Sequence, residues 1–172
     1  MSLIIETGGI VPGANSYASL ATVSAYHLSR NNAAWAAETH DEVQEAAILR
    51  AMDYIEAQNW LGAPYDGPVG GTGYQPLQWP RIDVYVGGFE WPNTQIPPKV
   101  ISALCEAALV ELVTPGALSV ALERGGAVIR EKVDVIETDY ASGAPATTVY
   151  QAIRQQLRGL VGSGNTITLV RV

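Results

Sequence analysis

The stretch IPPKVISALCEAALVELV, residues 96–113, decides the fold that we expect for this chain. Its apolar side chains recur at helical spacing, Pro97 and Pro98 preset the first helical turn, and a Pro-Gly pair follows its end. The breadth of the apolar face predicts that this helix is the most buried element. Its single cysteine, Cys105, is expected to be a small core residue.

A charged segment rich in β-branched residues follows this helix. It reads RGGAVIREKVDVIETDY, residues 124–140, and its alternation of apolar and polar residues fails near Asp134. A turn or bulge is therefore expected there. We predict a hairpin-like β element over residues 128–140, preceded by a short helical piece over residues 117–123.

Three further helices are predicted around the central one. Ser19 is a good N-cap for a helix over residues 20–29, and Thr39 with Glu42 has the spacing of a capping box for a helix over residues 39–58. A last helix is expected over residues 149–161. The fold class that results is mainly α. We expect one domain, residues 1–172, built as a bundle of four to five helices with a small β element.

Three segments lie outside this bundle. Residues 1–17 are predicted to form an extended arm that lies either on its own core or on a neighbouring subunit. Residues 59–95 hold half of the prolines and three of the four tryptophans, so they are expected to form a long structured loop with a short strand at 82–86. The tail TITLVRV, residues 166–172, alternates as a strand does and invites pairing with another sheet or subunit.

Charge and composition narrow the function classes. The formal net charge is -7 with a sequence pI near 4.7, whereas non-specific nucleic-acid binding depends on clustered Lys and Arg. One cysteine allows no disulfide framework. No run approaches the ~20 apolar residues that span a bilayer, and the first residues lack a basic signal-peptide region. We therefore expect a protein that is made in a cytoplasm.

No constellation in the sequence indicates catalysis. His27 and His40 stand outside any metal-binding motif, and we expect His27 at a helix surface or rim. Cys105 has no basic neighbour that would activate a thiolate. Residues 70–73, GGTG, lack the Lys that completes a phosphate-binding loop. We expect no enzymatic activity, no metal and no cofactor.

The chain resembles a known family in several ordered motifs. These are GANSYASLATVSAYH from residue 13, LQWPR from residue 77, the I-P-x-x-V start of the central helix, RGGAVIREKV from residue 124 and DYASGAP from residue 139. Together they resemble a tailed-phage family labelled DnaT-like single-stranded-DNA-binding proteins. The resemblance runs from about residue 13 to residue 160.

The second half also resembles the head–tail connector, or adaptor, proteins of tailed phages. In that group an I-P-x-x-V helix precedes a charged segment, a β stretch ending in Tyr and a short final helix. The resemblance implies an adaptor-like domain that docks under the portal protein and forms a homo-oligomeric ring of about twelve copies around the DNA channel. It implies a tail, tail-terminator or stopper protein as the further partner, with double-stranded DNA passing through without specific binding.

Two functions follow from these resemblances. The first is a structural virion protein of the neck, a connector that completes the head and is present in the host cytoplasm during assembly. The alternative is a single-stranded-DNA-binding replication accessory protein. The acidic charge favours the first, because base-stacking platforms normally sit in positively charged grooves and Arg81 is the only basic residue between positions 58 and 95.

The residues expected at an interface with another subunit or partner come from the loop, the charged segment and the tail. They are Tyr65, Tyr74, Trp79, Arg81, Trp91, Arg130, Lys132, Asp134, Tyr140, Ile167, Leu169 and Arg171.

Overall fold

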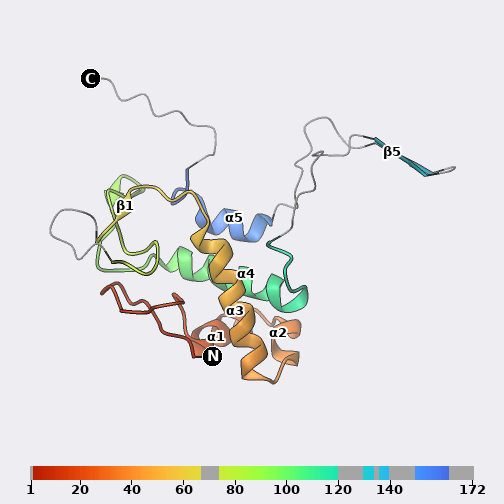
Figure 1. Cartoon of the computed structure of the whole chain (residues 1–172), viewed down its shortest axis with the longest axis horizontal. Helices are drawn as coiled ribbons and strands as arrows, with labels where there is room; N and C mark the ends of the chain where they lie inside the picture. Colours follow the sequence, from red (N-terminus) through yellow and green to blue (C-terminus); the bar gives the residue numbers. More distant parts are fainter. Residues whose placement is uncertain (1, 67–73, 120–129, 134–135, 140–149, 163–172) are drawn as a thin grey trace.

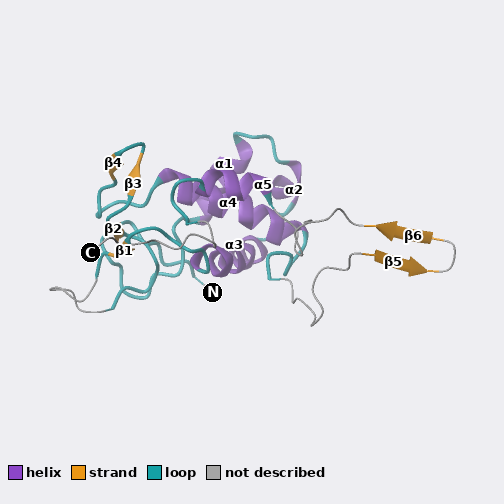
Figure 2. Ribbon diagram, turned by 90° about the horizontal axis from the view of Figure 1, so that it is seen from above, coloured by secondary structure: helices purple, strands orange, loops and turns teal. Residues whose placement is uncertain are grey.

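A computed structural model describes residues 2–66, 74–119, 130–133, 136–139 and 150–162. Within these residues the protein is mainly helical, with five helices and three antiparallel two-stranded sheets (Figure 1). The helices pack into one body, and the short strands lie outside it (Figure 2). The predicted mainly α fold is thus confirmed. No helix in the described ranges is long and apolar enough to cross a membrane.

The central helix α4 (Pro98–Val113) forms the middle of the core. It packs most extensively against α3 (Asp41–Glu56) and then against α5 (Gln151–Leu157). One whole face of α4 is buried, including Leu104 and Cys105. The prediction that this helix is the most buried element rested on its broad apolar face, and the packing agrees with it.

Helix α1 (Leu20–Leu28) begins as predicted. The side chain of Ser19 accepts a hydrogen bond from the backbone N–H of Thr22 at 3.2 Å. His27 is not on a surface or rim, as we expected, but is almost completely buried. Its Nε2 lies 3.1 Å from the carbonyl oxygen of Cys105, so the core supplies a partner for the ring.

The start of α3 differs from the prediction. The capping box of Thr39 and Glu42 does not form, because the helix begins after His40, which makes no side-chain cap bond. The carboxylate of Glu38 instead accepts hydrogen bonds from the backbone N–H and the Nδ1 of His40, both at 2.8 Å. A short helix that the sequence did not predict, α2 (Ala33–Ala37), precedes this turn.

The N-terminal arm lies on its own chain. The buried carboxylate of Glu6 accepts hydrogen bonds from three backbone N–H groups of the arm, those of Gly8, Ile10 and Val11. A Cβ atom at Gly8 would lie 2.1 Å from the carbonyl oxygen of Thr94, so the arm presses closely against the segment before α4. Of the two alternatives left open for the arm, the structure shows the intramolecular one.

In its described residues, 59–66 and 74–95, the long loop contains four short strands. These form two antiparallel pairs: β1 (Ala63–Pro64) with β2 (Arg81–Ile82), and β3 (Tyr85–Val86) with β4 (Phe89–Glu90). The predicted single strand over 82–86 is interrupted at Asp83, whose φ of +58° breaks the extended conformation. Figure 2 shows the β3–β4 hairpin standing away from the helices.

The charged segment forms a hairpin of β5 (Arg130–Val133) and β6 (Ile136–Asp139). The two strands are joined through residues 134 and 135, where a turn was predicted. Within the described residues, β5 and β6 contact each other and no other helix or strand.

Two predicted elements have different bounds. The last helix, α5, is shorter than the predicted 149–161. Residues 117–119 of the expected helical piece form a turn, with the backbone N–H of Ala117 bonded to the carbonyl oxygen of Thr114 at 3.1 Å. The rest of that piece, residues 120–123, and the predicted strand 166–172 lie outside the described residues.

Candidate functional site

The inner side of the 59–95 segment is anchored by two tryptophans. Trp79 is fully buried, and its ring packs edge-on against Trp60 with 5.6 Å between the ring centroids and 87° between the planes. Both belong to the same core as α3 and α4. The described parts of the segment, residues 59–66 and 74–95, are therefore anchored to the helical core.

A buried polar junction joins this segment to the rest of the chain. The hydroxyl of Tyr17 donates a hydrogen bond to Glu56 at the end of α3 and accepts one from the backbone N–H of Trp79 at 3.0 Å. The other carboxylate oxygen of Glu56 accepts the backbone N–H of Gln78 at 2.7 Å. Burial raises the pKa of Glu56, although these two donors act to lower it, and burial next to Glu56 raises the pKa of Tyr17.

The side chain of Arg81 is buried and hydrogen-bonded within its own chain. Its guanidinium donates four hydrogen bonds: Nε to the carbonyl of Leu61 at 2.7 Å, Nη2 to the carbonyl of Gly62 at 2.9 Å, and Nη1 to the carbonyl and side-chain oxygens of Gln78 at 3.1 and 2.7 Å. Burial lowers the pKa of Arg81, against the opposing effect of Tyr17 and Glu56. The one cation of this segment is thus unavailable to a ligand.

The outer side of the same segment carries exposed aromatic rings. Their exposed fractions are 42% for Tyr65, 63% for Tyr74, 58% for Tyr85 and 80% for Phe89. Trp91 is half-buried, and its Nε1 donates to the carbonyl oxygen of Gln95 at 3.1 Å. Exposed rings of this kind are enriched at protein–protein interfaces and also stack on nucleic-acid bases.

The charges on this outer side are acidic. The sequence from residue 59 to residue 95 contains Asp66, Asp83 and Glu90, while its only basic residue is the internally bonded Arg81. The aromatic rings therefore lie in a negative electrostatic setting, which favours a cationic or neutral partner over a phosphate backbone.

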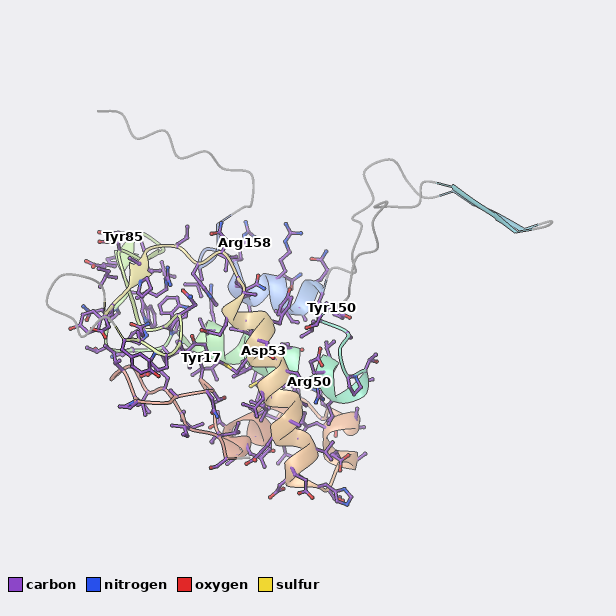
Figure 3. The ribbon with its side chains drawn as sticks, viewed as in Figure 1. Tyr17, Arg50, Asp53, Tyr85, Tyr150 and Arg158 are labelled. Atoms are coloured by element: carbon purple, nitrogen blue, oxygen red, sulfur yellow. The ribbon has the colours of Figure 1, made fainter. Side chains whose placement is uncertain are left out.

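A second candidate surface lies beside α5. Arg154 and Arg158 are exposed one helical turn apart, and they line a groove of about 380 Å³. The other lining residues are Gln151, Gln155, Gly159, Val161 and Gly162. We call this the arginine groove. Figure 3 shows Arg158 and Tyr85 on separate elements, apart from each other.

The structure sorts the predicted interface residues into three groups. Tyr65 and Tyr74 are exposed and Trp91 is half-buried, so an interface role for these three stays a prediction. Trp79 and Arg81 are buried within the chain, where they serve its own fold. The remaining residues are Arg130 and Lys132, which lie on β5, and Asp134, Tyr140, Ile167, Leu169 and Arg171, which lie outside the described residues.

The predicted interface residues did not include two exposed aromatic residues of the β3–β4 hairpin. Tyr85 and Phe89 flank the β3–β4 turn, which is built from Gly87 and Gly88 at φ of +62° and +86°. A Gly-Gly pair between apolar residues is a hairpin signal, and it could have identified these two rings as the exposed pair.

The described parts of the chain bear on the metal-site and thiolate expectations. Those residues contain no group of three His, Cys, Asp or Glu side chains placed to hold a metal ion. His27 is bonded within the core, and burial lowers its pKa, against the raising effect of the Cys105 carbonyl. Burial also raises the pKa of the Cys105 thiol to about 12, so it is not a thiolate at neutral pH.

The chain is acidic, and the part of it that the structure describes is mainly helical. Comparison with known families identifies the family of the chain. The model of a family described as "Putative DnaT-like ssDNA binding protein" matches residues 1–172, and the chain belongs to this family. No curated protein and no solved structure matches the chain. The resemblance to head–tail connectors has no support from these comparisons.

Proposed function

We propose that this chain is a structural subunit of a tailed-phage neck, a connector that forms a ring between portal and tail. The observation that carries this proposal is the β5–β6 hairpin, which contacts no other described element of its own chain. An isolated two-stranded hairpin is only marginally stable in water, so it needs a further surface to pack on. A neighbouring subunit or the portal protein supplies that surface in a ring.

The charge distribution supports the same proposal. The chain carries a net charge of -7, and the exposed rings of the 59–95 segment lie among acidic residues. A subunit that surrounds a DNA channel must let the duplex slide, so a protein of strongly acidic net charge fits that task. The proposed role is one of assembly, and it requires no catalysis and no cofactor.

Single-stranded-DNA binding is the second candidate, and the family description favours it directly. The structure offers rings that could stack on bases, Tyr85 and Phe89 among them, and two exposed cations at Arg154 and Arg158. This function predicts that the chain binds oligothymidylate and that the affinity falls steeply with salt. In a plot of the logarithm of the binding constant against the logarithm of the salt concentration, the slope should be about -0.7 per phosphate contacted.

Counting copies in purified particles separates the two candidates. Quantitative mass spectrometry against a capsid protein of known copy number should give about twelve copies per particle if the chain forms a neck ring. A chain that is abundant in infected cells, absent from particles and bound to oligothymidylate would establish the second candidate instead.

Replacing residues 130–139 with a Gly-Ser linker of equal length tests the hairpin itself. Because β5 and β6 contact no other described element, the helical body should keep its thermal midpoint, while incorporation into particles should be lost. The matched control replaces exposed Glu42 with Gln, which should leave both unchanged. A body that unfolds without the hairpin would contradict its assignment to assembly.

A further inference from the structure

We propose that the β3–β4 hairpin of one copy docks into the arginine groove of a second copy. The inference rests on the proposed function in one respect, namely that the ring supplies the second copy. It names the contact between neighbours: aromatic and acidic side chains of the hairpin against the two arginines beside α5.

The hairpin is presented as a rigid projection. Its base is fixed, because Val84 is fully buried and its carbonyl oxygen accepts the backbone N–H of Trp91 at 2.7 Å. Among the described elements, its strands contact only each other, and they carry the exposed rings of Tyr85 and Phe89. A fixed base with an unburied aromatic tip has the form of an interface anchor.

The arginine groove holds cations that the rest of the fold leaves unused. Arg30 lies over a tyrosine ring, Arg50 pairs with a buried carboxylate, and Arg81 is bonded to backbone oxygens. Arg154 and Arg158 have no side-chain hydrogen bond or ion pair with any described residue. In a chain of strongly acidic net charge, two adjacent unpaired guanidinium groups are well placed to receive an acidic partner.

The two surfaces complement each other in chemistry. Glu90 on β4 is paired directly with Tyr85 on β3, and residues opposite each other in a hairpin share a face, so one face of the projection offers both a carboxylate and a ring to the guanidinium groups. A second hollow, of about 430 Å³ beside Trp35, includes the carboxylate-bearing Glu38 in its lining. That carboxylate would repel Glu90, which makes the arginine groove the better acceptor.

The contact joins two copies rather than two parts of one chain. No contact links β3 or β4 with α5, and Tyr85 and Arg158 of one chain lie apart (Figure 3). Because the hairpin and the groove are different surfaces, each copy carries one donor and one acceptor. A head-to-tail contact of this type closes a ring when its rotation permits, as a connector requires.

Charge reversal and its rescue test the contact. Sedimentation of the full chain, measured at concentrations up to ~200 µM, should show self-association. Glu90→Arg or Arg158→Glu alone should raise the dissociation constant about tenfold, the equivalent of one lost charge pair. The double variant should regain most of that loss. Lys99→Glu, at an exposed site on α4, is the control and should change nothing. Circular dichroism confirms that each variant is folded.

Three results would overturn the inference. One is a wild-type chain that remains monomeric over the whole concentration range, and another is a double variant no better than its singles. The third is an Arg158→Glu chain that loses oligothymidylate binding without any change in self-association, because the groove would then serve DNA. Copy number in particles is measured separately, so a failed contact with about twelve copies present would leave the connector function standing.

Discussion

Replacing Tyr17 with Phe removes one oxygen atom from the junction that holds the 59–95 segment to α3. That oxygen donates to the carboxylate of Glu56 and accepts the backbone N–H of Trp79, so its loss leaves a buried N–H unpaired. An unpaired buried group costs about 1–3 kcal/mol, and a hydrogen bond to a charged group contributes about 1.5–3 kcal/mol. Because one hydroxyl serves both bonds, we expect a total loss of about 3 kcal/mol.

Urea unfolding at pH 7, followed by tryptophan fluorescence, measures this loss. Destabilisation by about 3 kcal/mol should also lower the thermal midpoint by roughly 6–12 °C for a chain of this length. Tyr54→Phe is the matched control, because this half-buried ring packs against the core while its hydroxyl makes no hydrogen bond with a described residue. Equal destabilisation by the two variants would refute the reasoning.

The same variant has a predicted pH dependence. The pKa of Glu56 is raised in the folded protein, so the folded state holds a proton more tightly than the unfolded state, and stability falls as pH rises through that pKa. Removing the Tyr17 hydroxyl takes away a donor to the ionised carboxylate and raises the pKa further. The stability difference between wild type and variant should therefore be larger at pH 7 than at pH 4, where the carboxyl is largely protonated.

Three other perturbations follow from buried groups of the fold. Burial acts to raise the pKa of Glu111, but its bonds to two backbone N–H groups and to Arg50 outweigh this and lower the pKa. Glu111→Gln should therefore reduce the free energy of unfolding by about 2 kcal/mol at pH 7. In urea unfolding, this difference between wild type and variant should close below about pH 4. The lowered pKa of His27 means that wild-type stability should fall as pH drops from about 7 to 5, and thermal scans of His27→Gln should show a flatter profile. Gly8→Ala should lower the thermal midpoint sharply, since its Cβ would meet backbone at φ +105°, whereas Gly9→Ala, with open space, should not; equal midpoints would contradict this.

Local signals account for the parts of the fold that the sequence predicted well. The Pro pair and the helical spacing of apolar residues define α4, and the hydroxyl of Ser19 caps α1, because each of these effects acts within one or two helical turns. The hairpin of β5 and β6 was predicted from β-branched residues and a change in alternation over a few residues. None of these features needs a distant partner to be read.

The candidate surfaces were harder to predict for a physical reason. A segment rich in Pro and Gly has no regular period, so nothing in it separates the ring that turns inward from the ring that turns outward. Trp79 and Arg81 were grouped with Tyr65 and Tyr74 as interface residues, yet the first two are buried and the last two exposed. Trp79 is held by the hydroxyl of Tyr17 in the N-terminal arm, whereas Arg81 is held by oxygen atoms of its own segment, at Leu61, Gly62 and Gln78.

By itself, then, the sequence determined a mainly helical domain, its central helix, the position of its charged hairpin and its acidic character. Only the tertiary structure decided which polar and aromatic side chains are free to act. The buried ring of His27 is partnered by a carbonyl 78 residues away, and the backbone N–H of the buried Trp79 is partnered by a hydroxyl 62 residues away. Such partners are brought together by packing alone, and no local pattern records them.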